Sequence, residues 1–321
     1  MPKTGTTSLE RHVYPNATGY LGRSYGEGGR HQPSPAEDLF DIYRTSWSES
    51  DVGPALVAWS RPHLEHESLL VANEMLTLWG HAGQESQFHP LSDYSHESGF
   101  RRTGAHPVAQ FLEHLQVALP ADWSLRVLLT LRGQTTMLAS QYAQESGGMQ
   151  AASQADFEAK VQRIVREADA YYDYANLIRS LQSVVSTEHL AVGLIEDGLV
   201  GIVRAVREFN PSVPSKFETD VERLPRENVR STGSGWPLRP RRLGVAMSGP
   251  TSRLRRILPA DLRKIARRSL TGVDAWRERG FEAGRIEVSD NLRTAIQAAY
   301  RESNQALETM LGRLLPAGYV D

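Results

Sequence analysis

The sequence predicts an α/β protein, a three-layer sandwich in which a central, mostly parallel sheet of four or five strands lies between helical layers. Nearly continuous apolar segments of strand length are typical of parallel strands covered on both faces. Segments with the apolar spacing of helices follow them along the chain. The 321 residues, 40% hydrophobic and 23% charged, suffice for a sizeable core, and we expect one domain over residues 1–321.

Three segments have the pattern of buried strands, and they cover residues 67–74, 125–132 and 189–196. The second, Leu-Arg-Val-Leu-Leu-Thr-Leu-Arg, is almost continuously apolar, which favours a place in the middle of the sheet. It brings Arg132 to its carboxyl end, the edge at which open α/β sheets bind their ligands. The third strand ends in Glu196, for which we expect a structural role.

Helical patterns of apolar residues surround these strands. We expect helices over residues 6–12, 107–119, 134–142, 154–168, 171–185, 199–209, 259–269 and 291–311. Long polar connections, residues 19–37 and 80–106, separate the first elements. Because long ordered loops often carry functional groups, the first connection is a candidate substrate-binding segment.

Composition excludes several classes of protein. The absence of cysteine excludes disulfides, thiolate metal sites and a cysteine nucleophile. The sequence has neither the pattern of a signal peptide nor an apolar run long enough to span a bilayer, so we expect a cytoplasmic protein without stable membrane insertion. Nine of the ten histidines precede residue 115, but no H-E-x-x-H motif accompanies them, and we expect no metal. No G-x-S-x-G elbow supports a serine hydrolase.

The charge of the chain is unevenly distributed. Residues 223–268 hold thirteen Arg or Lys against two acids, an excess of +11 in a chain whose formal net charge is −2. This stretch is a solvated face, a lid or linker over a polyanionic ligand, or a surface for an acidic acceptor, a membrane or nucleic acid. Since it lacks interleaved aromatic residues beyond Trp236, we expect no nucleic-acid partner. The prolines of residues 231–252 make that part unsuited to helix or strand.

The opening segment Pro2–Leu9, Pro-Lys-Thr-Gly-Thr-Thr-Ser-Leu, has the composition of an anion-binding loop. A glycine lets the backbone approach an oxyanion, and the N–H groups and positive dipole end of a following helix favour negative charge. The Thr hydroxyls and the Lys3 ammonium add donors. Lys3 precedes Gly5, whereas the P-loop of nucleotide triphosphatases places its lysine after the glycine, and this order argues against an ATPase.

This segment resembles the 5′-phosphosulfate loop of sulfotransferases that use 3′-phosphoadenosine 5′-phosphosulfate (PAPS). A second stretch, Leu-Arg-x-Gln-x-x-x-Leu-Ala-Ser-x-Tyr from Leu131 to Tyr142, resembles the 3′-phosphate motif of the same family. A third, Tyr-x-x-Ser-Asn-x-x-Leu from Tyr300, followed by Gly318 and Tyr319, resembles the C-terminal helix of bacterial sulfotransferase-like proteins. The resemblance implies the P-loop-like sulfotransferase fold.

The resemblance also implies roles for single residues. Lys3 would stabilise charge on the leaving-group side of the sulfuryl group, and Arg132 and Ser140 would hold the 3′-phosphate. An arginine fork gives a phosphate two charge-assisted hydrogen bonds, and a serine adds a compact donor. The residues that would bind the cofactor are Lys3, Thr4, Gly5, Thr6, Thr7, Arg132 and Ser140.

Sulfuryl transfer also needs a base that takes the proton of the acceptor hydroxyl. Sulfotransferases use Glu or His for this step, and no motif singles one out here. Glu27 lies in the segment after the loop helix and is the first candidate. Glu74, at the end of the strand before the Arg132 strand, is the second, and His12 is the third.

The expected function is therefore transfer of the sulfuryl group of PAPS to a hydroxyl of a small molecule or glycan, for example a carbohydrate or glycolipid. The alternative is a noncatalytic relative that binds PAPS, adenosine 3′,5′-bisphosphate or another anion. A third reading, a nucleic-acid or membrane module, rests on residues 223–268 alone.

The resemblance departs from the family at the beginning of the chain. In sulfotransferases an apolar strand in the middle of the sheet precedes the loop, but only Met1 precedes Pro2 here. We expect a true start upstream, and weaker PAPS binding and lower stability for the chain as given. The alternative is that another segment or subunit fills the position.

Overall fold

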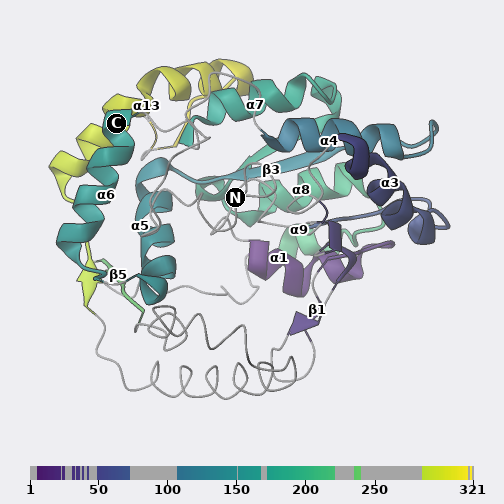
Figure 1. Cartoon of the computed structure of the whole chain (residues 1–321), viewed down its shortest axis with the longest axis horizontal. Coiled ribbons are helices and arrows are strands. Elements are labelled where there is room, and N and C mark those ends of the chain that lie inside the picture. Colours follow the sequence, from purple (N-terminus) through teal and green to yellow (C-terminus); the bar gives the residue numbers. More distant parts are fainter. Residues whose placement is uncertain are drawn as a thin grey trace.

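The structure is a computed structural model. It describes residues 6–22, 24–25, 31–32, 34–36, 38–39, 42, 49–72, 107–149, 151–167, 172–220, 235–239, 284–316 and 319. The statements that follow concern these residues. Figure 1 shows them as coloured ribbon.

A parallel pair of strands lies at the centre of the described fold (Figure 1). β3 (Val127–Leu131) and β4 (Leu190–Leu194) are paired over five residues each, in register from end to end. Both consist mainly of Val and Leu, which suit a buried pleated surface. Gly193 in β4 lets a helix approach closely, because a Cβ atom at this position would lie 2.6 Å from the Cγ1 of Ile202.

Helices make up most of the remaining described structure. They are α1 (Thr6–His12), α3 (Glu49–Ser60), α4 (Pro107–Ala118), α5 (Gln134–Glu145), α6 (Gln154–Glu167), α7 (Tyr174–Gln182), α8 (Leu199–Phe209), α9 (Lys216–Asp220) and α13 (Asp290–Leu311). Two short antiparallel strand pairs and one isolated bridge complete the described secondary structure. These join β1 (Ser24–Tyr25) to β2 (His31–Gln32), β5 (Trp236–Pro237) to β6 (Arg285–Ile286), and Tyr20 to Leu70.

The helices cover both faces of the parallel pair. In Figure 1, α4 and α7 lie on one side of β3, and α1, α8 and α9 lie on the other. Successive side chains of β3 point to these two sides, as in any strand. Leu129 and Leu131 belong to the core that α4 and α7 line, while Leu128 packs against the core formed by α1 and α8.

The longest described helix, α13, has well-defined ends. The side chain of Ser289 accepts a hydrogen bond from the N–H of Leu292 at 3.3 Å, which is an N-cap. Gly312 ends the helix with φ 64°, the left-handed conformation that glycine adopts without strain. The buried side of α13 packs against α5, α6 and α7.

The predicted helices that lie within the described residues are confirmed. These are the ones expected over residues 6–12, 107–119, 134–142, 154–168, 171–185, 199–209 and 291–311. The helix predicted from residue 171 begins only at Tyr174, because the carboxylate of Asp173 caps it by accepting from the N–H of Asn176 at 2.9 Å. The helix expected over residues 259–269 lies outside the described residues.

The predicted sheet is confirmed only in its coarse form. The described chain is a mixed helix and strand structure with a two-stranded parallel sheet, and a sheet of four or five strands is not among the described residues. Within the strand expected over residues 67–74, residues 68–72 form a single bridge, between Leu70 and Tyr20. Residues 73 and 74 lie outside the described part.

The basic stretch 223–268 lies outside the described residues except for residues 235–239, so its role as a lid stays a prediction. The expectation that residues 231–252 hold no strand is wrong at Trp236–Pro237, which pairs with Arg285–Ile286. A proline is tolerated in so short a pair because few ladder hydrogen bonds depend on its missing N–H.

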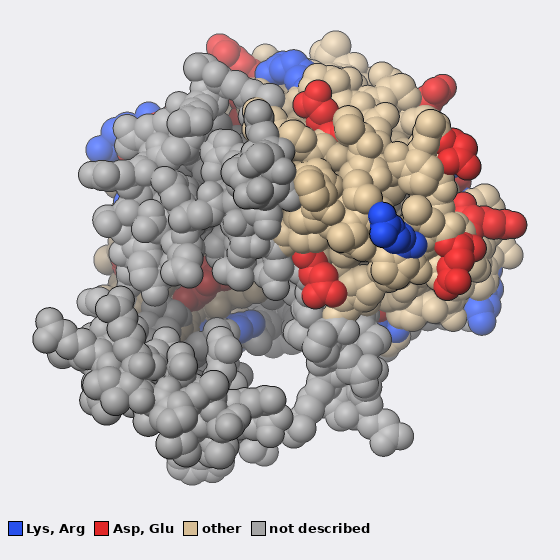
Figure 2. Space-filling model, turned by 45° about the vertical axis from the view of Figure 1, so that its right-hand side comes forward, with Lys and Arg blue, Asp and Glu red and all other residues tan. Residues whose placement is uncertain are grey.

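On the face drawn in Figure 2 the described basic side chains lie apart from one another, whereas several acidic side chains lie near each other along the right-hand edge. None of the described helices has the length and apolar character needed to cross a bilayer.

Candidate functional site

The turn between β3 and α5 carries Arg132 at the carboxyl end of a parallel strand. Two hydrogen bonds from other elements hold the turn. The N–H of Gly133 donates to Oε1 of Glu196 at 2.9 Å, and the hydroxyl of Tyr174 donates to the carbonyl of Arg132 at 2.7 Å. Glu196 follows β4, so the ends of both parallel strands are tied together. The expected structural role of Glu196 is confirmed.

Ser140 lies on the helix that follows this turn. Gly133, Thr136 and Ser140 are three, four and seven residues apart, so they share one face of α5. Ser140 is about 9 Å along the helix axis from Gln134, at a rise of roughly 1.5 Å per residue. Its side chain is buried. A strand end, a turn and one helical face therefore bring Arg132 and Ser140 into the same structural unit.

The C-terminal helix supports the beginning of α5 from the interior. The amide of Gln134 donates to Oδ1 of Asn304 at 2.8 Å, and Nδ2 of Asn304 donates to the carbonyl of Tyr319 at 2.6 Å. Gln134 and Asn304 are both almost completely buried, at 1% exposure each. A buried amide pair with satisfied partners fixes the relative position of two helices more specifically than apolar contact does.

A second contact ties α13 to α7. Ser303 donates to Oδ1 of Asp173 at 2.7 Å and accepts from the N–H of Ala175 at 3.3 Å. Tyr300, one turn earlier, meets the ring of Tyr172 edge-on with centroids 6.2 Å apart. The Tyr-x-x-Ser-Asn motif of the sequence thus connects α13 to the elements around Arg132.

Tyr319 closes this network beside the turn. Its hydroxyl donates to Oε2 of Glu196 at 3.2 Å. Burial, followed by the neighbouring Tyr174 and the Glu196 carboxylate, raises the pKa of the Tyr319 phenol far above its ordinary value. The phenol therefore stays neutral and remains a donor, which keeps the carboxylate oriented toward the N–H of Gly133.

The structure describes only part of the predicted site. Arg132 directly follows β3 and Ser140 lies on α5, while their joint role in binding a phosphate stays a prediction. Thr6 and Thr7 form the first turn of α1, which confirms that a helix follows the opening loop. His12, the third candidate base, is half-buried in the last turn of that helix. Lys3, Thr4, Gly5, Glu27 and Glu74 lie outside the described residues. The proximity of the opening loop to Arg132 stays a prediction.

Sequence reasoning missed the residues that support the turn. Gln134, Tyr174 and Tyr319 do not stand out as a group in the sequence, although Asn304 and Tyr319 belong to the motif of the C-terminal helix. The sequence contains one indication of them. Asn304 is a polar amide among the apolar positions that form the buried face of α13, and a buried amide needs a hydrogen-bond partner. The sequence does not reveal which partner it meets.

The arrangement is suited to binding an oxyanion. Arg132 follows the carboxyl end of β3, and the buried Ser140 lies on the helix that comes next, and arginine and serine side chains are donors that suit an oxyanion. Among the described residues, no group of three or more His, Asp or Glu side chains is placed to hold a metal ion.

Comparison with known protein families, with curated proteins and with solved structures finds no match to this chain. The resemblance to sulfotransferases consequently rests on the motif residues alone, in the opening loop, the β3–α5 unit and α13.

Proposed function

We propose that this protein is a PAPS-dependent sulfotransferase with a hydroxyl acceptor on a small molecule or glycan. The observation that carries the proposal is the β3–turn–α5 unit, in which Arg132 ends a parallel strand and Ser140 follows on the adjoining helix. The opening loop supports it, because its sequence fits the second anion of the same nucleotide. In this proposal the sheet has four or five strands within one three-layer domain.

The reaction requires little covalent chemistry from the protein. The acceptor oxygen attacks sulfur, the bond from sulfur to the phosphate bridge oxygen breaks, and adenosine 3′,5′-bisphosphate leaves. Lys3 stabilises the negative charge that develops on the bridge oxygen. The 5′-phosphate is held by Thr4, Gly5, Thr6 and Thr7. Arg132 and Ser140 hold the 3′-phosphate, and Glu27 takes the acceptor proton, with Glu74 and His12 as the other candidates.

The chain offers a matched control for the role of Arg132. Arg126 precedes the same strand at its other end, where it donates to the carbonyl of Phe209 at 3.3 Å. Replacing Arg132 by Ala should lower the affinity for adenosine 3′,5′-bisphosphate by roughly 1.5–3 kcal/mol, as for a hydrogen bond to a charged group. Arg126→Ala should leave this affinity unchanged. Titration calorimetry of both variants compares them directly.

Equal affinity in the two variants would remove Arg132 from the binding site and with it the main support for the proposal. Catalysis is tested separately, by incubating the protein with radiolabelled PAPS and cell extract and identifying the labelled product. Tight binding of the bisphosphate without any sulfated product would favour the noncatalytic alternative.

A further inference from the structure

The two hydrogen bonds at the β3–α5 turn meet on a single peptide group. The carbonyl that accepts from Tyr174 at 2.7 Å belongs to Arg132, and the N–H that donates to Glu196 at 2.9 Å belongs to Gly133. These are the C=O and the N–H of the one peptide bond that joins Arg132 to Gly133. A trans peptide group is planar, and its C=O and N–H point in opposite directions. Tyr174 and Glu196 therefore hold one rigid plane from opposite edges.

The plane held in this way determines how the chain leaves Arg132. Leu131, the residue before it, is paired with Leu194 of β4, so the sheet fixes the chain on one side. The peptide held by Tyr174 and Glu196 fixes it on the other side. Because each residue has only two soft backbone angles, fixing both flanking peptide planes sets the direction of the bond from Cα to Cβ of Arg132. The two hydrogen bonds thus control the direction in which the arginine side chain leaves the strand.

A third residue connects the two partners. Tyr319 donates to the second carboxylate oxygen of Glu196 at 3.2 Å, and its ring meets that of Tyr174 edge-on with centroids 6.3 Å apart. Both tyrosines are completely buried, so packing restricts their side chains to one position. We call Tyr174, Glu196 and Tyr319 the peptide clamp. Its members come from α7, from the end of β4 and from the C-terminal segment, which are far apart in the sequence.

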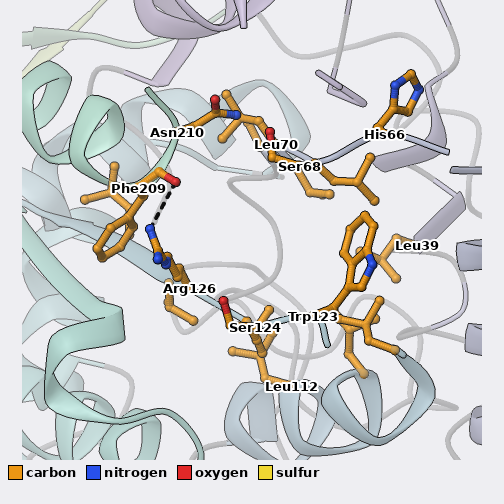
Figure 3. A pocket seen from close by; sticks show the side chains of 18 of the residues that line it. Leu39, His66, Ser68, Leu70, Leu112, Trp123, Ser124, Arg126, Phe209 and Asn210 are labelled. Atoms are coloured by element: carbon orange, nitrogen blue, oxygen red, sulfur yellow. Dashed lines mark hydrogen bonds between the residues drawn. The ribbon is translucent and has the colours of Figure 1, made fainter. Parts of the chain in front are cut away.

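The arginine at the other end of β3 is held differently. Arg126 lines a cavity of about 830 Å³ that lies between residues 64–72 and residues 122–130. Figure 3 shows its guanidinium beside Phe209, to whose carbonyl it donates at 3.3 Å. That contact holds the side chain of Arg126, whereas the peptide clamp acts on the backbone of Arg132. Arg126 is therefore a control for effects that reach a ligand through Arg132.

We propose that the peptide clamp positions Arg132 for the 3′-phosphate, which makes Tyr174, Glu196 and Tyr319 positioning residues of the nucleotide site. This inference rests on the proposed function and extends it to residues that act through Arg132. An arginine that is oriented before the nucleotide arrives loses less conformational freedom on binding, and the affinity rises accordingly. The charge of Glu196 by itself opposes a phosphate, so this residue favours binding only through the N–H of Gly133.

The first test removes one hydroxyl group. Tyr174→Phe keeps the buried ring and deletes the hydrogen bond to the carbonyl of Arg132. We expect the affinity for adenosine 3′,5′-bisphosphate, measured by titration calorimetry, to fall roughly three- to tenfold, the effect of one hydrogen bond. Tyr172→Phe is the matched control, because Tyr172 is equally buried and its hydroxyl donates to Gln141 at 3.0 Å. This variant should bind the bisphosphate like the unaltered protein.

A double-mutant cycle separates positioning from a general loss of structure. In an Arg132→Ala background, Tyr174→Phe should change the affinity by less than about twofold, because no arginine remains to be positioned. In an Arg126→Ala background, Tyr174→Phe should keep its full effect. An equal loss of affinity in both backgrounds would show a general structural effect and overturn the inference.

Two substitutions of Glu196 test the other edge of the peptide. Glu196→Gln and Glu196→Ala both remove the charge, but only glutamine keeps an oxygen that can accept from the N–H of Gly133. We expect the alanine variant to bind the bisphosphate roughly three- to tenfold more weakly than the glutamine variant. Amide hydrogen exchange of Gly133, measured by NMR without nucleotide, should be faster in the alanine variant. Equal affinity or equal exchange in the two variants would refute the clamp.

These measurements distinguish a failure of the inference from a failure of the proposed function. If the unaltered protein does not bind the bisphosphate, the proposed function fails and the positioning role fails with it. If Arg132→Ala weakens binding and Tyr174→Phe does not, the proposed function stands and the peptide clamp alone is refuted.

Discussion

At the scale of single residues, buried polar side chains carry much of the specificity of this structure. Asn304 joins Gln134 of α5 to the carbonyl of Tyr319, and Asp173 joins Ser303 to the first turn of α7. Burying each of these polar groups costs desolvation free energy, and the contact stabilises the fold only when every hydrogen-bond partner is present. The β3–α5 turn, which carries Arg132, is therefore held by side chains that need not touch a ligand.

Removing one partner of the amide pair should be destabilising. Asn304→Ala leaves the buried amide of Gln134 without its main partner, and we expect a loss of about 1–3 kcal/mol in the free energy of unfolding. Gln305→Ala, at the next and exposed position of α13, is the control and should change stability by less than about 0.5 kcal/mol. Urea unfolding followed by circular dichroism measures both. Similar losses in the two variants would mean that the amide pair has no special weight.

The role proposed for Lys3 is to stabilise the transition state. Lys3→Ala should lower turnover by a factor on the order of 10²–10³, as for other single donors of this kind, while sparing nucleotide affinity. The contrast with Arg132→Ala, which should mainly weaken binding, is measured by steady-state kinetics together with calorimetry. If Lys3→Ala loses as much nucleotide affinity as Arg132→Ala does, the two roles are not distinct.

At the scale of elements, close approach between β4 and α8 depends on a glycine. A Cβ atom at position 193 would lie 2.6 Å from the Cγ1 of Ile202, so either this side chain or α8 itself would have to shift. This contact belongs to packing between elements, and sequence patterning of either element alone does not show it. The helix α8 itself contains a glycine, Gly201, which is exposed and has open space around it.

These two glycines give opposite predictions for the same substitution. Gly193→Ala should destabilise the protein by about 1–3 kcal/mol through overpacking. Gly201→Ala should stabilise it by up to about 1 kcal/mol, because alanine has the higher helix propensity and meets no neighbour. Thermal unfolding of the two variants measures the sign of each effect. A stabilised Gly193→Ala variant would show that α8 does not pack on β4 as described.

At the scale of the whole molecule, two cores meet at the parallel strand pair, and buried phenols lie in both. Tyr14 belongs to the core of α1 and α8, and Tyr319 to the core that also contains α4, α5 and α13. Burial is the main reason that the pKa of each phenol is raised above its ordinary value of 10.0. Both phenols therefore remain neutral in the folded protein at a pH where the unfolded chain begins to lose these protons.

This difference predicts how stability depends on alkaline pH. The folded pKa lies above the unfolded one, so the contribution is complete below about pH 10 and is lost as pH rises above that value. Each buried phenol should reduce the free energy of unfolding by about 1.4 kcal/mol per pH unit above pH 10. Urea unfolding between pH 9 and pH 11 measures the slope, and Tyr319→Phe should make it shallower. If the slope is the same in this variant as in the unaltered protein, the pKa of Tyr319 does not differ between the folded and the unfolded chain.

The sequence by itself determined the two central strands and the described helices other than α3 and α9, because the spacing of apolar residues depends only on the 3.6-residue and two-residue periods of the backbone. It also placed Arg132 at a strand end and Ser140 on the following helix, since both belong to one continuous segment. The strand predicted over residues 67–74 illustrates the limit. Its residues have the right pattern, yet residues 68–72 form one bridge only, and a cavity separates them from β3. Only the tertiary structure decided which buried groups meet across the chain, such as Gln134 with Asn304 or Gly133 with Glu196, because periodicity identifies the buried face of an element and not its neighbour.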